Sequence, residues 1–180
     1  MKRTLLLSGL IAVSAFAGEL KGVKMPDEVQ VEGKALKLNG MGLRVKFIVS
    51  VYVAGLYLET PNKDANAILK ADEARRVDMK MLRDLEKKAI VDAIRTGFDK
   101  NASAQLPALK ERLDTFCGLI NDLKEGQTLS ISYVPGKGTS VAGSAGATLV
   151  PGKDFADALF SVWLGKVPVD DGLKKGMLGG

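Results

Sequence analysis

The sequence contains no histidine, and this absence removes several kinds of chemistry at once. Without imidazole groups the chain cannot build a Ser-His-Asp triad, use a histidine as general base or hold a metal through histidine ligands. It has one cysteine, Cys117, so no internal disulfide can form. Cys117 lies in an apolar helical pattern, which favours a buried small hydrophobe over a reactive thiol. Acid-base chemistry would fall to Tyr, Lys, Arg, Asp or Glu, and we expect neither a metal nor a cofactor.

Long hydrophobic runs are also absent, but a short one follows the N-terminus. Two basic residues precede an uncharged run over residues 4–16, and Ala15, Phe16 and Ala17 form an A-x-A cleavage motif. This layout predicts a secretory signal peptide over residues 1–17 and a periplasmic protein without stable membrane insertion after cleavage. The alternative is an uncleaved signal anchor.

A strong charge of either sign is missing as well. Loss of Lys2 and Arg3 with the signal would lower the formal net charge from +5 to +3. Basic and acidic residues alternate along the chain, which is typical of solvated helix faces, so we expect no nucleic-acid partner. Residues 18–180 are enough for one domain with a substantial core.

Apolar residues follow the period of strands in several segments. We expect short strands at residues 29–31 and 35–38 joined by a turn, and a central strand or strand pair over residues 43–58. A half-buried strand over residues 76–82 and hairpins within residues 128–150 complete the predicted sheet. The glycines at 40 and 42, 135–138 and 143–146 favour turns over phosphate-binding loops, because no Gly-Lys-Ser/Thr sequence or strand-to-helix context accompanies them.

Helical periodicity appears between these strands. A short helix over residues 64–70 has Asp64 as its cap, and two longer amphipathic helices cover residues 89–98 and 106–120, with Ser103 as a cap of the second. A further helix begins at Asp154 and ends at Gly165, and a short one starts at residues 168–170. The order of elements predicts an α+β domain with helices layered on one face of a largely antiparallel sheet.

Two blocks of sequence resemble a known family. Residues 38–47 and 51–58 combine Gly-x-Gly-x-Arg with Tyr-x-x-Gly-x-Tyr, and residues 155–165 continue into Pro168-Val169 and Leu173-Lys174. Together with Arg83-Asp84 they resemble the exported bacterial branch of the chalcone isomerase-like proteins. The resemblance implies the family's open-faced sandwich. It does not settle the function, because the family contains plant isomerases, noncatalytic fatty-acid binders and exported members of poorly defined role.

The resemblance also implies a site. Arg44 matches the arginine that stabilises an oxyanion in the enzymes and grips the fatty-acid head group in the binders, and Tyr52 matches a tyrosine of the binders. Arg44 lies in an apolar segment, so its charge needs an anionic partner; an internal ion pair or a solvent-facing edge position is the alternative to a ligand. In one straight strand Arg44 and Tyr52 would lie roughly 26 Å apart, at about 3.3 Å per residue. A shared ligand therefore requires a chain reversal or bulge between Lys46 and Ser50, where no turn signal is present.

Three further positions favour a fatty acid over a flavonoid. Leu109, Phe116 and Val162 stand approximately where the plant isomerases carry a tyrosine, an asparagine and a hydroxyl-bearing residue, so they would make the cavity wall more apolar. The alternative is that they only fill the core.

These observations give three hypotheses for the function. The first is a periplasmic protein that binds a fatty-acid-like or other apolar carboxylate between sheet and helices, with Arg44 and Tyr52 at its head group. The second is an intramolecular lyase of the chalcone isomerase type that stabilises an oxyanion with Arg44. The third is a noncatalytic envelope scaffold whose surface binds another protein.

Overall fold

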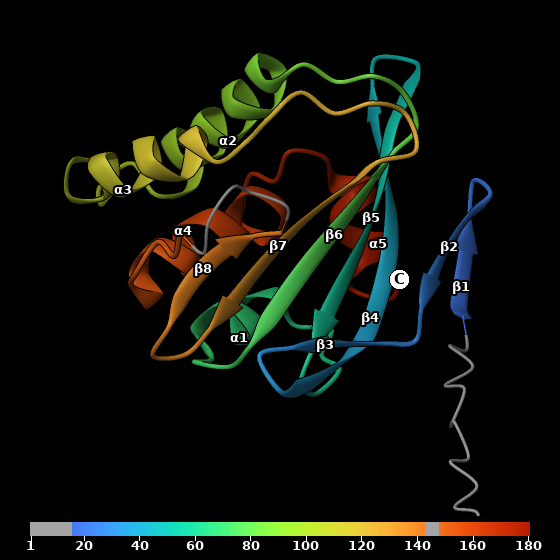
Figure 1. Cartoon of the computed structure of the whole chain (residues 1–180), viewed down its shortest axis with the longest axis horizontal. Coiled ribbons are helices and arrows are strands. Elements are labelled where there is room, and N and C mark those ends of the chain that lie inside the picture. Colours follow the sequence, from blue (N-terminus) through green and yellow to red (C-terminus); the bar gives the residue numbers. More distant parts are fainter. Residues whose placement is uncertain (1–15, 143–147) are drawn as a thin grey trace, which may run out of the picture.

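The structure is a computed structural model of the whole chain, and it describes residues 16–142 and 148–180. Residues 1–15, which hold most of the predicted signal peptide, and the predicted turn at 143–146 lie outside the described residues. The described elements follow the order β1 to β5, α1, β6, α2, α3, β7, β8, α4 and α5 (Figure 1). None of the helices in those two stretches is both long and apolar enough to cross a membrane.

Six strands form one sheet in the order β3-β4-β5-β6-β7-β8. All neighbours in it are antiparallel, which confirms the predicted α+β class with an antiparallel sheet. The first predicted hairpin is present, and Glu32 and Gly33 at its turn have φ of 51° and 79°. The strands are β3 (Glu28–Val31), β4 (Lys34–Lys46), β5 (Val49–Leu58), β6 (Arg75–Met81), β7 (Thr128–Val134) and β8 (Gly138–Val141).

The predicted central segment over residues 43–58 is a strand pair. The chain reverses at Phe47 and Ile48, so the end of β4 returns directly along β5. The register places Arg44 opposite Tyr52, with an irregularity between Arg44 and Val45. The reversal that a shared ligand required is therefore present, although the tip contains none of the residues that usually signal a turn.

The helices gather on one face of the sheet, as predicted (Figure 1). Helix α4 is buried at nearly every position because it packs against α1, α2 and α3 as well as toward the core. Gly97 of α2 lets Val162 of α4 approach closely, since a Cβ at this position would lie 2.6 Å from a Val162 methyl carbon. The helices are α1 (Ala65–Lys70), α2 (Lys87–Asn101), α3 (Leu106–Gly118), α4 (Lys153–Leu164) and α5 (Asp171–Met177).

One of the three predicted helix caps is confirmed. The Asp64 side chain accepts hydrogen bonds from the first turn of α1, as predicted. The prediction for Ser103 is wrong, because α3 begins later, with Pro107 in its first turn, and Ser103 supplies only its backbone carbonyl to that start. The prediction for Asp154 is also wrong: Gly152 is the N-cap, and Asp154 lies inside the first turn, where it pairs with Arg112 at 2.7 Å.

The other face of the sheet carries a feature that the sequence did not predict. Strands β1 (Phe16–Leu20) and β2 (Val23–Pro26) form a separate hairpin beside β4. Val23 and Met25 of β2 pack with Val53 of β5 in a small cluster separate from the main core. The sheet is thus covered by helices on one face and partly by this hairpin on the other (Figure 1).

Helix α5 rests directly on the backbone of β4. A Cβ at Gly42 would lie 2.2 Å from the carbonyl oxygen of Leu173, and one at Gly40 would lie 2.3 Å from that of Gly176. On the helix side, a Cβ at Gly176 would lie 2.4 Å from the carbonyl oxygen of Met41. Gly40 and Gly42 therefore permit close packing of α5, which holds the start of this helix beside Arg44.

Candidate functional site

Arg44 and Tyr52 form a cross-strand pair on the helical face of the sheet. Side chains directly opposite each other in an antiparallel pair have Cβ atoms about 5 Å apart, so both can reach one ligand. Tyr52 is buried, whereas the Arg44 side chain keeps 18% of its surface exposed. Arg44 is therefore neither enclosed nor free in solvent; it lies at a boundary.

Asp170, the N-cap of α5, is the acidic partner of Arg44. One oxygen, Oδ2, lies 3.2 Å from Arg44 Nη1 and accepts a hydrogen bond of the same length from the Val45 backbone nitrogen. The other, Oδ1, accepts from the Leu173 nitrogen at 2.9 Å. Burial would raise the pKa of Asp170, but these hydrogen bonds and the charge of Arg44 outweigh it, so the pKa lies below its ordinary value. Asp170 thus stays ionised and holds Arg44 in place.

The guanidinium retains unused donors. Within the described part of the chain, Arg44 makes its two hydrogen bonds from Nη1, which donates to the Val45 carbonyl oxygen and to Asp170. Nε and Nη2 donate to no protein group among residues 16–142 and 148–180. A guanidinium has five N–H donors, so three remain to meet an anion.

The Tyr52 hydroxyl is oriented by α4. Trp163 Nε1 donates to the Tyr52 oxygen at 3.2 Å. Burial raises the pKa of Tyr52 to about 12, and the hydrogen bond from Trp163 and the nearby Arg44 only partly offset this effect. At neutral pH the hydroxyl therefore keeps its proton and can donate it to a neighbouring oxygen.

An apolar cavity of about 90 Å³ opens beside this pair. Arg44, Lys46 and Tyr52 provide its polar groups. The rest of the wall comes from β5, β6, β7, α2, α4 and their connections and is nearly all apolar: Val51, Met79, Met81, Leu85, Ala89, Ile90, Ala93, Ile94, Leu129, Val162, Trp163 and Val169.

A wider and more polar groove of about 450 Å³ adjoins the cavity. The two spaces share Arg44, Lys46, Ala89, Ala93 and Val169 in their walls. Charged residues of both signs from α2 and the segment before it line the groove. Arg44 therefore stands where a polar groove meets an apolar interior, which is the geometry expected for an amphipathic ligand.

Comparison with known proteins decides the family. The family model described as chalcone isomerase-like matches residues 17–179. The chain belongs to the chalcone isomerase-like family. No curated protein matches. Among solved structures, a fatty-acid binding protein of Arabidopsis thaliana is similar at 17% identity and a TM-score of 0.66, covering 87% of this chain and 92% of that one. This likeness confirms the chalcone isomerase-like fold.

Of the other site residues predicted from the family resemblance, one lines the cavity. Val162 forms part of its wall and packs against Gly97. Leu109 and Phe116 line neither the cavity nor the groove; both are buried in the main core, where the Phe116 ring lies 5.8 Å from that of Phe155. Their placement favours the alternative role of filling the core.

Sequence reasoning did not assign Trp163 and Asp170 to the site. It predicted the helix that carries Trp163 and the helix start at residues 168–170 that includes Asp170. Nothing in the local pattern of this chalcone isomerase-like sequence shows that these positions meet Tyr52 and Arg44, because the contacts span more than a hundred residues. The sequence contains one indication of the cavity. Ala89 and Ala93 are small residues four positions apart, so they lie on one face of α2 and leave space beside the sheet.

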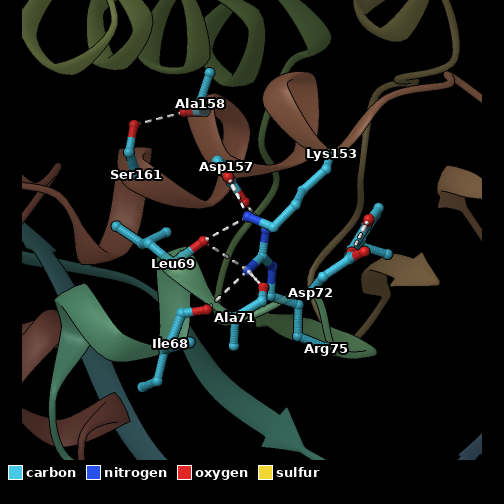
Figure 2. A network of polar contacts seen from close by, with 10 residues as sticks. Ile68, Leu69, Ala71, Asp72, Arg75, Lys153, Asp157, Ala158 and Ser161 are labelled. Atoms are coloured by element: carbon cyan, nitrogen blue, oxygen red, sulfur yellow. Dashed lines mark hydrogen bonds and ion pairs between the residues drawn. The ribbon is translucent and has the colours of Figure 1, made fainter. Parts of the chain in front are cut away.

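A buried arginine, Arg75, shows how a guanidinium enclosed by protein groups is held in this fold. Arg75 is 1% exposed and pairs with Asp157 at 2.5 Å (Figure 2). It also donates to the Ile68 carbonyl at 2.9 Å and, over longer distances, to the carbonyls of Leu69 and Ala71 at the end of α1. Its carbon Cζ lies 4.8 Å from the centre of the Phe160 ring. The Nε atom of Arg75 has no hydrogen-bond partner among the described residues, so the two arginines differ in burial: protein groups enclose Arg75, whereas Arg44 borders the groove.

Proposed function

We propose that this protein binds a fatty-acid-like carboxylate, with the head group at Arg44 and the alkyl chain in the apolar cavity. The observation that carries the proposal is the position of Arg44 at the junction of groove and cavity with three unused donors. The fold of a structurally similar plant protein, described as a fatty-acid binding protein, supports it. Binding of this kind needs no cofactor.

Arg44 and Tyr52 suit a carboxylate in chemistry as well as in position. A carboxylate accepts paired hydrogen bonds from a guanidinium, and the neutral Tyr52 hydroxyl adds a third donor from the neighbouring strand. Asp170 keeps the guanidinium oriented while leaving Nε and Nη2 to the ligand. The head group would therefore lie over the Arg44 and Tyr52 pair.

The size of the cavity selects the chain length. A water-sized group needs about 10–15 Å³ of such volume, so a cavity of about 90 Å³ takes on the order of six to nine water-sized groups and fewer of the larger methylene groups. A short chain such as that of octanoate matches this size best, whereas a long acyl chain would extend far into the groove. Octanoate is accordingly the probe we choose.

The experiment compares Arg44→Ala with a matched control, Arg95→Ala. Arg95 is also an ion-paired arginine, bound to Asp114 at 2.7 Å, and it lines neither the cavity nor the groove. Calorimetric titration with octanoate should show an affinity loss of about tenfold or more in Arg44→Ala, because hydrogen bonds to charged groups contribute roughly 1.5–3 kcal/mol. Arg95→Ala should bind like the wild type, and neutral octanol should not distinguish the three proteins.

Equal octanoate affinity in Arg44→Ala and the wild type would contradict the proposal.

The same donors of Arg44 and Tyr52 can stabilise an oxyanion, which is the isomerase hypothesis. Tyr52, with a pKa of about 12, and the ionised, hydrogen-bonded Asp170 are poorly matched to proton transfer at neutral pH. Turnover of a chalcone that is lost in Arg44→Ala would favour the enzyme.

The proposal includes a periplasmic location, supported by the signal-like pattern of residues 1–17. Cleavage behind Ala17 would leave three of the four β1–β2 pairs, from Gly18↔Met25 to Leu20↔Val23. We therefore expect the intact mass of the purified protein to correspond to a chain beginning at Gly18. A mass that retains residues 1–17 would contradict this part of the proposal.

A further inference from the structure

The tip of the β4–β5 hairpin exposes two large apolar side chains. Phe47 is 91% exposed and Ile48 is 95% exposed, and Val49 beside them is 38% exposed. The hairpin projects beyond the neighbouring strands of the sheet (Figure 1). These side chains gain nothing from the core of their own chain, so their role lies in an external contact.

The backbone at the tip makes this choice of residues more informative. Phe47 has φ of 58°, the left-handed region in which a bulky residue is unfavourable and glycine or asparagine is usual. Two-residue hairpin turns normally place Gly, Asn or Asp at such a position. Local structure therefore disfavours phenylalanine here, and its side chain stabilises no buried contact in return.

Basic side chains lie next to the tip and along the adjoining groove. Lys46 directly precedes Phe47 and lines both the groove and the cavity, as Arg44 does. Lys88 and Lys100 also line the groove, where Lys88 is ion-paired with Asp92 at 2.6 Å and Glu86 adds a further acid. An exposed aromatic and an aliphatic side chain beside a basic residue, Lys46, match the interface of an anionic bilayer.

We propose that the Phe47–Ile48 tip docks reversibly on the surface of an anionic lipid bilayer and brings the mouth of the cavity to the lipid head groups. Two side chains fall well short of the roughly 800 Å² per partner that a stable protein interface buries. They are sufficient for shallow insertion assisted by charge, and an apolar ligand would then pass between bilayer and cavity without crossing water. Docking itself does not depend on which ligand the cavity holds.

The test measures the binding of the purified protein, with any natural processing retained, to lipid vesicles. The vesicles contain either phosphatidylglycerol and phosphatidylethanolamine or phosphatidylcholine alone. The key variant is Phe47→Gly with Ile48→Ser. Glycine relieves the left-handed strain, so this variant should unfold at the same temperature as the wild type or higher. Its affinity for the anionic vesicles should nevertheless fall about tenfold or more. Leu149→Ser, which removes a 45% exposed apolar residue elsewhere, should bind like the wild type.

A position-specific signal separates tip insertion from binding through another part of the chain. The emission of a Phe47→Trp variant should shift to the blue on anionic vesicles, whereas that of Leu149→Trp should not; native Trp163 is buried and contributes the same background to both. Three results would overturn the proposal. They are no binding of the wild type to anionic vesicles, equal binding by the double variant, and an unshifted Phe47→Trp emission.

Discussion

Asp170 does two things with its two carboxylate oxygens. Oδ1 caps α5 through the Leu173 nitrogen, and Oδ2 holds Arg44 and the Val45 nitrogen. A single residue thereby fixes the start of a helix and the orientation of the cation at the site. The lowered pKa of Asp170 means that the folded state favours its ionised form.

We expect Asp170→Asn to separate these roles. Asparagine caps helices as well as aspartate does, so the variant loses the charge but keeps the cap. A carboxyl whose folded pKa is lowered contributes stability above its unfolded pKa of about 3.9 and loses it as the pH falls through the folded value. Urea unfolding should therefore show the variant about 1 kcal/mol less stable at roughly pH 7, with a smaller difference at roughly pH 3.

The control for this measurement is Asp171→Asn, an exposed acid in the same helical turn. It should show a smaller difference from the wild type near neutral pH. A gap between wild type and Asp170→Asn that is the same at both pH values would show that the charge of Asp170 does not stabilise the fold.

A comparison of Arg44 with Arg75 shows how far the burial of a charged residue can be predicted from its neighbours in sequence. Arg44 was predicted to need an anionic partner because its neighbours are apolar, and the structure contains an internal one, Asp170, which was the alternative to a ligand. Arg75 is more deeply buried, yet Glu73 lies two positions before it and Arg76 directly after it, and this charged context conceals its burial. Its partner Asp157 lies 82 positions away, so only the fold reveals the pair.

At the scale of elements, the packing of α5 on β4 positions the site. Gly42 has no space for a side chain, so Gly42→Ala must displace α5 or the strand. We expect a loss of about 2 kcal/mol in unfolding free energy and weaker octanoate binding, because Asp170 moves with the helix. Thermal or urea unfolding and calorimetric titration measure both effects.

Gly118→Ala is the matched control. Gly118 ends α3, and a Cβ there meets nothing within 4 Å, so alanine should be neutral or slightly stabilising. Wild-type stability in Gly42→Ala would contradict the role that we assign to close packing of α5 and β4.

Periodicity predicted most strands and helices, because one apolar face on each element is a local property. The reversal at Phe47 and Ile48 was only an open alternative, because these residues are not the ones that usually form turns. We infer that an external contact accounts for them instead. The caps at Ser103 and Asp154 failed because a helix can begin one or two residues from the best capping side chain. The β1–β2 hairpin was not predicted, because β1 begins at Phe16, inside the predicted signal peptide.

At the scale of the whole molecule, the fold was predicted through the resemblance of two sequence blocks to a family, and the family match and the structure confirm it. The cavity could not be predicted in the same way. Its volume depends on how far α2 and α4 stand from the sheet, which is set by contacts such as Gly97 against Val162. The sequence supplied Arg44, Tyr52 and Val162, while the structure supplied the space that they share.

The central claim is that Arg44 meets the carboxylate of an apolar ligand. The direct measurement is an NMR pH titration of bound octanoate that carries an isotopic label at its carboxyl carbon. A guanidinium within hydrogen-bonding distance stabilises the ionised form, so the pKa of the bound carboxyl should lie well below that of free octanoate and return toward it in Arg44→Ala. A bound carboxyl that titrates like free octanoate in the wild-type protein would contradict the account.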